Sequence, residues 1–168
     1  MKAKIIVEGR EFEVDINDPE LQKLLEPQPK HTGYERVAKG GWYYIANLCA
    51  TASDIDDRQP YNDDMYENAN YYSDLDIAKN NLRADKLMRQ LRRFAVEHRE
   101  SSVDWQSAHR SKYYIDYNHG KSIFDIFSNE IYQALGVVYF DSKKTAELAI
   151  ETFHDELIWY FTEYQDSL

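Results

Sequence analysis

Apolar and polar residues alternate in short segments near the start of the chain, and this period is typical of β-strands. Residues 4–7 and 11–16 alternate on either side of a glycine-containing turn and predict a β-hairpin. Asp18 followed by Pro19 predicts the start of a short helix, because Asp caps helices and Pro favours their first position. We therefore expect an accessory hairpin and short helix over residues 1–25.

Two longer stretches carry apolar residues at the three- and four-residue spacing of an amphipathic helix. The first follows Ser73, which stands three residues before Asp76 as in a capping box. The second follows Asp141 or Ser142, either of which is a suitable cap. We expect both apolar stripes to lie in the core. They comprise Ile77, Ala84, Leu87, Met88, Leu91, Phe94 and Ala95 in the first helix, and Ala146, Ala149, Ile150, Phe153, Leu157, Tyr160, Phe161 and Tyr164 in the second.

Each predicted helix is preceded by three predicted strands. These are residues 42–46, 49–53 and 71–72 before the first helix, and 113–117, 123–127 and 137–140 before the second. The segment between residues 54 and 70 is expected to be a polar loop. The same order of elements indicates a duplicated unit, with Tyr43 superposed on Tyr113, Tyr71 on Tyr139 and Ala78 on Ala146.

The expected fold class is α+β. Two pseudo-repeats of antiparallel strands followed by a helix come after the N-terminal β-hairpin and short helix. The expected boundaries are a linker at 26–41, a first repeat at 42–96, a connector at 97–111 and a second repeat at 112–168. We expect one compact domain overall, because 168 residues are enough for a single core.

The composition indicates a folded, acidic protein. Hydrophobic residues make up 43% and aromatic residues 14%, whereas disordered chains lack such residues. The net charge of −10 disfavours direct binding to nucleic acid, which requires Lys and Arg to displace counterions. One cysteine, Cys49, cannot form an internal disulfide, and no apolar run reaches the roughly 20 residues of a membrane span. We expect a cytoplasmic protein without a membrane partner.

The segment from Ser53 to Asp76 is unusually acidic and rich in tyrosine. One interpretation is a solvated loop, because runs of charge are usually exposed. Another is a partner-binding surface, in which tyrosines anchor a partner and carboxylates match its basic residues. A calcium site is disfavoured, because the segment lacks the ligand spacing of an EF-hand loop. The candidate partner-binding residues are Asp54, Asp56, Asp57, Tyr61, Asp63, Asp64, Tyr66, Glu67, Tyr71 and Tyr72.

The first long helix also carries a basic face over residues 79–99. Such a face is able to contact phosphates, or it pairs within the molecule with the acidic last helix. The negative field of the whole protein favours the second interpretation. The alternative binding face consists of Arg83, Lys86, Arg89, Arg92 and Arg93.

No pattern typical of an enzyme occurs. The five histidines show no metal-binding spacing, Cys49 has no histidine near it in sequence, and phosphate-binding and hydrolase motifs are missing. We therefore expect no catalytic residue, no metal and no cofactor. Trp159 falls beside the main stripe of its helix, which suggests a second apolar patch for a partner or for a homo-oligomer.

Three segments resemble a known group of sequences. They are residues 32–37, 69–73 and 136–140, with Ala146, Ala149 and Ile150. They are similar to small uncharacterised proteins of bacteriophages and prophages from Gram-positive and gut bacteria. This resemblance implies a phage protein in the host cytoplasm. It supports the hypothesis of an anti-CRISPR-like or DNA-mimic inhibitor of a host nucleic-acid-targeting defence system. The alternatives are a phage structural or assembly protein and a nucleic-acid-binding or nucleotide-binding module.

Overall fold

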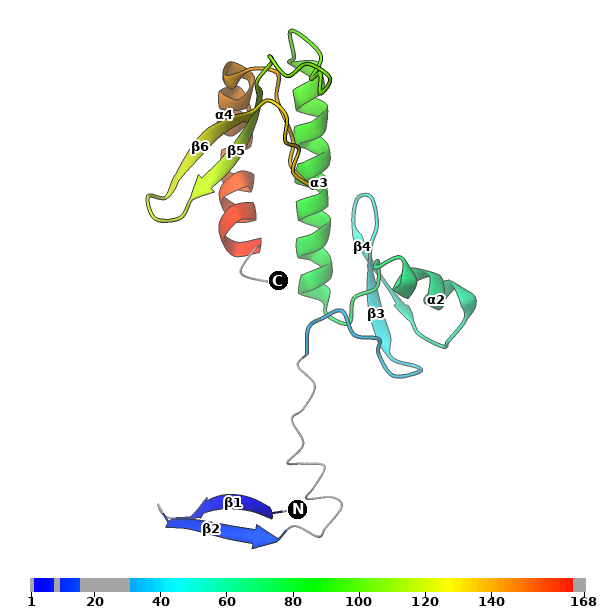
Figure 1. The fold of residues 1–168 in the computed structure, drawn as a ribbon. Helices are drawn as coiled ribbons and strands as arrows, with labels where there is room; N and C mark the ends of the chain where they lie inside the picture. The colour runs from blue at the N-terminus through cyan, green and yellow to red at the C-terminus, as the bar shows by residue number, and fades with distance from the viewer. Residues whose placement is uncertain (1, 8–9, 16–30, 165–168) are drawn as a thin grey trace. The chain divides into compact units, whose positions relative to one another are not determined.

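The computed structural model describes residues 2–7, 10–15 and 31–164 (Figure 1). Whereas the sequence suggests one domain, the residue contacts separate the chain into two compact units, Met1–Thr32 and Gly33–Leu168. The boundary falls inside the predicted linker, and each unit is described by itself. The short helix predicted after Pro19 lies outside the described residues.

The first unit contains the predicted β-hairpin. Strand β1 (Lys2–Val7) pairs with β2 (Arg10–Asp15) in antiparallel register, from Lys2 opposite Asp15 to Val7 opposite Arg10. Lys4 also contacts Glu11 at 3.2 Å, but both side chains are well exposed, so this ion pair adds little stability.

Two further antiparallel hairpins belong to the second unit. Strand β3 (Trp42–Ala46) pairs with β4 (Thr51–Ile55), and β5 (Lys112–Asn118) pairs with β6 (Ile123–Asn129). The predicted third strands are reduced to isolated bridges. Tyr72 bridges Tyr44, and Phe140 bridges Tyr113. The expected fold class is thus confirmed as α+β, with short hairpins in place of three-stranded units.

Three helices complete the second unit (Figure 1). They are α2 (Pro60–Glu67), α3 (Leu75–Glu97) and α4 (Lys143–Trp159), and α4 continues as the π-helical turn η1 (Tyr160–Tyr164). The loop predicted before residue 70 is wrong, because α2 occupies much of it.

The caps of the two long helices agree only in part with the sequence. Asp74, and not Ser73, caps α3 by accepting hydrogen bonds from the N–H groups of Asp76 at 2.8 Å and Ile77 at 3.0 Å. Ser142 caps α4 as expected, accepting from the N–H of Thr145 at 3.1 Å.

The two predicted repeats agree in the buried alanine of each long helix and differ in the tyrosine that forms the bridge. Ala78 and Ala146 are both fully buried in the first turn of their helices. Tyr44 bridges Tyr72 in the first hairpin as Tyr113 bridges Phe140 in the second. Tyr113 therefore corresponds to Tyr44, whereas the sequence predicted a correspondence with Tyr43. By the same comparison, Lys112 takes the place of Tyr43. Superposition of the whole units stays a prediction.

The main core lies between α3, α4 and the β5–β6 hairpin. Leu87, Leu91 and Phe94 of α3 pack there with Leu157 of α4 and Phe140. Other predicted core residues are only partly buried, among them Ile77, Met88, Ile150, Phe153 and Phe161. One reason is local, since Phe153 has non-helical φ and ψ angles of −116° and 21° that kink α4.

A second, smaller core lies beneath the β3–β4 hairpin. Tyr43, Ile45 and Tyr71 are buried there, with Val37 and Met65 packed against them. Figure 1 shows α2 on the side of this hairpin that faces away from α3. This small core therefore holds α2, and with it most of the acidic segment, in a defined place.

Candidate functional site

Helix α2 forms because its first turn satisfies its own main-chain groups. Pro60 occupies the first turn, where a missing N–H costs nothing, and Gln59 and Asn62 form a reciprocal capping box. The buried Asn62 side chain also donates to the Tyr43 hydroxyl at 3.1 Å. Met65 packs on the small core, so α2 is held at two points along its length.

Asp56 lies directly after β4 and is completely buried. Its carboxylate accepts hydrogen bonds from Arg36 Nε at 2.8 Å, Arg58 Nη1 at 2.6 Å and Tyr71 Oη at 2.8 Å. The main-chain N–H of Arg58 donates to it as well, at 3.0 Å. The prediction that Asp56 contacts a partner is therefore wrong, because this carboxylate is a structural centre that joins three chain segments.

The electrostatics of this centre follow from its geometry. The hydrogen bonds from Arg36 hold the pKa of Asp56 well below its usual range, and the Tyr71 hydroxyl and the Arg58 N–H lower it further. Burial, and then the hydrogen bond to the negative Asp56, raise the pKa of Tyr71 to about 12. Asp56 is thus a carboxylate and Tyr71 a neutral donor across the physiological pH range.

Tyr71 and Tyr72 are also core residues and not surface anchors as predicted, with exposed fractions of 2% and 6%. The Tyr71 ring stacks on Tyr43 with 4.1 Å between centroids and meets Tyr66 edge-on at 5.4 Å. Burial raises the pKa of Tyr72 to about 12. Alternation in the sequence did not reveal this, because Tyr43, on which Tyr71 stacks, and Tyr44, which Tyr72 bridges, lie in an earlier strand.

The remaining candidate residues do gather on α2 and the adjoining end of β4. Tyr61 and Tyr66 are exposed by 49% and 42%. Asp63 is half-buried, and its Oδ1 pairs with Arg36 Nη2 at 2.6 Å. The guanidinium carbon of Arg36 also lies 5.6 Å from the centroid of the Tyr66 ring. The other carboxylates are exposed and form no ion pair within the described part of the chain. We call the following set the acidic surface: Asp54, Asp57, Tyr61, Asp63, Asp64, Tyr66 and Glu67.

The basic face of α3 forms the wall of a groove beside the tip of the β3–β4 hairpin. The groove has a volume of about 650 Å³. It is lined by Leu48, Cys49, Leu82, Arg83, Lys86, Arg89, Gln90 and Arg93. Lys86 and Arg89 are exposed and form no ion pair among the described residues. Arg92 is exposed but does not line this groove, so the groove brings together four of the five predicted basic residues.

Arg83 is already engaged within the molecule. Its guanidinium makes a two-point contact with Glu156, at 2.8 Å and 3.1 Å, and lies 3.9 Å from the centroid of the Trp159 ring. Trp159 is only 6% exposed, so the prediction of a second apolar patch at this residue is wrong. The opposite charges of the two long helices therefore meet in part, as one interpretation of the sequence expected.

A residue that the sequence analysis did not single out is Lys112, which is 1% exposed. Its ammonium donates to the carbonyls of Ser107 and Glu130, each at 2.7 Å, and lies 5.1 Å from the Trp105 ring centroid. It ties the connector to the loop after β6. Its position before two strand tyrosines was the one available signal.

Other chemistry is sparse in the described part of the chain. There, no three His, Cys, Asp or Glu side chains lie together as a metal site would require. Cys49 is a free, exposed thiol. None of the described helices combines the length and the apolar character needed to cross a membrane.

Comparisons with family models, with curated proteins and with solved structures found no match to this chain.

Proposed function

We propose that this chain is a non-enzymatic protein-binding module whose acidic surface occupies a basic, nucleic-acid-binding groove of a partner protein. The observation that carries the proposal is the pair of exposed tyrosines, Tyr61 and Tyr66, on helix α2. This helix is fixed to the small core by the hydrogen bond from Asn62 to Tyr43. Tyrosine contributes large contact area with few rotatable bonds. A helix that is already ordered loses little further freedom on binding, so more of the contact energy becomes affinity.

The charges around these tyrosines fit a basic partner. Asp56 and Asp63 are neutralised by Arg36 and Arg58, whereas Asp57, Asp64 and Glu67 form no ion pair in the described part of the chain. Exposed charges of one sign mainly raise the association rate and make it sensitive to salt. This pattern is also what an imitation of a phosphate backbone requires.

The proposed biological setting rests on the phage resemblance. A phage protein of this kind acts in the bacterial cytoplasm as an inhibitor of a nucleic-acid-targeting defence system, in the manner of anti-CRISPR proteins or DNA mimics. A structural or assembly role in the phage is the alternative. Gene neighbourhood separates them, because an early anti-defence cluster favours inhibition and a head or tail module favours assembly.

A second candidate function is supported by the groove beside α3. Lys86 and Arg89 leave two positive charges uncompensated there, next to Arg93. Such a site suits a phosphate-bearing ligand. It is the weaker candidate, because the net charge of −10 repels polyanions at long range.

The experiment is capture of proteins from the DNA-binding fraction of a bacterial lysate by the immobilised chain. Tyr61→Ala, and a triple variant with Asp57→Asn, Asp64→Asn and Glu67→Gln, should each reduce capture. Added double-stranded DNA should compete with the chain, because both are proposed to occupy the same grooves. Capture should also weaken with salt for the wild type more than for the triple variant.

The matched control has the same change in net charge on another surface. Glu151→Gln, Asp155→Asn and Glu163→Gln alter three exposed carboxylates of α4 and η1 and should leave capture unchanged. Equal loss in both triple variants, or no competition by DNA, would reject the proposed surface. Loss only when Lys86 and Arg89 are replaced would support the second candidate instead.

A further inference from the structure

Strand β6 has one paired edge and one unpaired edge within the part of the chain that the structure describes. The N–H and C=O of Tyr113 both pair with Phe140, on the side of β5 away from β6. Because main-chain groups alternate along an antiparallel ladder, Ser128, which lies opposite Tyr113, directs its N–H and C=O away from β5. By the same alternation, Ile126 and Phe124 also direct theirs to the open edge.

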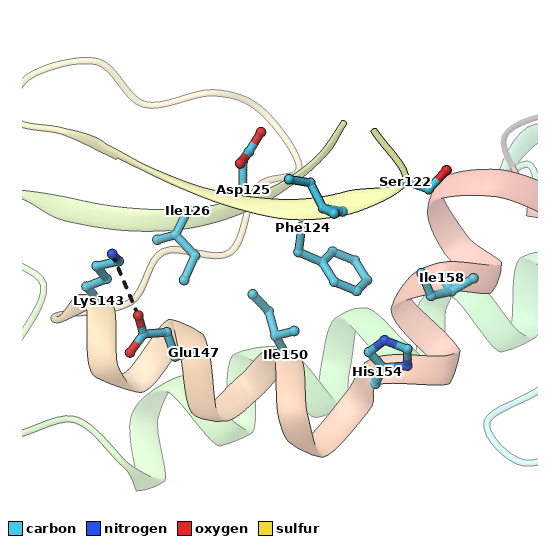
Figure 2. A pocket seen from close by; sticks show the side chains of 10 residues that line it. Ser122, Phe124, Asp125, Ile126, Lys143, Glu147, Ile150, His154 and Ile158 are labelled. Atoms are coloured by element: carbon cyan, nitrogen blue, oxygen red, sulfur yellow. Dashed lines mark ion pairs between the residues drawn. The ribbon is translucent and has the colours of Figure 1, made fainter. Parts of the chain in front are cut away.

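A groove of about 610 Å³ runs between this strand and α4. Figure 2 shows Phe124 and Ile126 directed from the strand towards Ile150 on α4, whereas Asp125 is directed away from the helix. The α4 wall is completed by Lys143, Glu147, His154 and Ile158. An added strand at the open edge would therefore meet free main-chain groups beside a wall of mixed apolar and polar side chains.

The edge carries little of the usual protection against pairing, since its one charged residue is Asp125. Its seven residues contain no Pro and no Lys, the residues with which natural proteins commonly block edge strands. Ile123 and Phe127, on the face away from α4, are 46% and 47% exposed.

We propose that β6 pairs with β6 of a second copy of the chain, antiparallel about a two-fold axis through Ile126. A two-fold antiparallel pair places one residue opposite itself, and the open-edge groups of Ile126 suit that place. Phe124 then faces Ser128 of the partner subunit. The open-edge N–H and C=O groups of the two copies thus pair in one antiparallel ladder. A pair centred on Asp125 is excluded, because it would set two carboxylates opposite each other.

Charge complementarity supports this register. On the face away from α4, Asp125 lies opposite Phe127 of the partner subunit and meets no like charge. Just outside the strand, Ser122 lies opposite Glu130 of the partner subunit and is next to Lys121 in the sequence. Stable interfaces bury on the order of 1,600 Å² in total, and the exposed side chains of Ile123 and Phe127 add to the area that the two strands supply.

The test is the mass of the full chain in solution, by sedimentation velocity over a wide concentration range. The wild type should be a dimer of 19.9 kDa chains. Phe127→Glu should weaken the dimer about tenfold, because Glu would face Asp125 of the partner subunit at two symmetric positions. Phe127→Lys should retain it, because Lys would face the same carboxylate. Adding Asp125→Lys to Phe127→Glu should restore the dimer by exchanging the charges.

Phe12→Glu is the matched control, since Phe12 is 47% exposed on a strand of the other unit, and this variant should leave the mass unchanged. Far-ultraviolet circular dichroism verifies that every variant is folded. A wild type that is monomeric at every concentration overturns the proposal and leaves the edge to a foreign strand. A dimer that survives Phe127→Glu, or one that both substitutions break equally, also overturns it. These residues lie outside the acidic surface, so either proposal can fail while the other stands.

Discussion

Replacing Asp56 by Asn should destabilise the chain by about 3 kcal/mol, because it removes the negative member of a buried ion-pair centre. The carboxylate is completely buried, while the Arg36 and Arg58 side chains are 25% and 36% exposed. Partial solvation of both guanidinium groups places the cost near the lower end of the 3–5 kcal/mol typical of broken buried pairs. The Asn side chain keeps one acceptor oxygen but has no negative charge to balance two cations.

The effect should depend on pH in a defined direction. The pKa of Asp56 is lowered in the folded chain from an ordinary value of 3.8, so its ionised form stabilises the fold above that value. This contribution is lost as pH falls from about 5 towards the lowered pKa. The difference in stability between wild type and Asp56→Asn should therefore be full at neutral pH and shrink in acid.

The assay is urea unfolding of the full chain, followed by circular dichroism and tyrosine fluorescence at several pH values. Asp54→Asn is the matched control, since Asp54 is exposed and bonds only to the neighbouring N–H of Ile55 at 2.8 Å. It should change the free energy of unfolding by less than about 0.5 kcal/mol. A similar small change for Asp56→Asn, or a deficit that stays constant into acid, would refute the reasoning.

Three further predictions concern the fold, and urea unfolding measures each of them. Lys112→Met should cost about 2 kcal/mol, because the carbonyls of Ser107 and Glu130 lose a charged donor; a neutral result would contradict the assigned contacts. Gly40→Ala should cost about 1 kcal/mol for its φ of +85°, and Gly33→Ala more, since its Cβ would lie 2.7 Å from an α3 side chain. Leu157→Ala should cost about 3 kcal/mol, and Phe153→Ala less despite its larger ring, because it is only partly buried; the reverse order would place Phe153 in the core.

Periodicity, together with turn and capping residues, was enough to predict the long helices and the hairpins. The apolar stripe that contains Leu87, Leu91 and Phe94 repeats every three or four residues, so only a helix brings these side chains to one face. Strand β3 was predicted with its observed ends, whereas its partner β4 was predicted at residues 49–53, two residues before its observed place. These features depend on neighbours in the sequence, and such neighbours are visible without a fold.

Helix α2 was missed because it has no apolar stripe. Its inward side consists chiefly of Asn62 and Met65, and five of its eight residues are proline, amide or acidic. The signals that were present were Pro60 after Gln59 and the capping box that Gln59 makes with Asn62. Composition indicated a loop, whereas the small core beneath β3 supplies the contacts that make a helix stable there.

The sequence by itself determined the α+β class, the order of the main elements and the acidic character of the segment after β4. Tertiary structure alone decided which charges face solvent. Asp56 belongs to a run of carboxylates that looks uniform in sequence, yet Arg36, 20 residues earlier, makes its burial favourable. Lys112 likewise finds its acceptor on Glu130, 18 residues later. A buried charge is stable only beside a partner, and partners distant along the chain meet only when it folds.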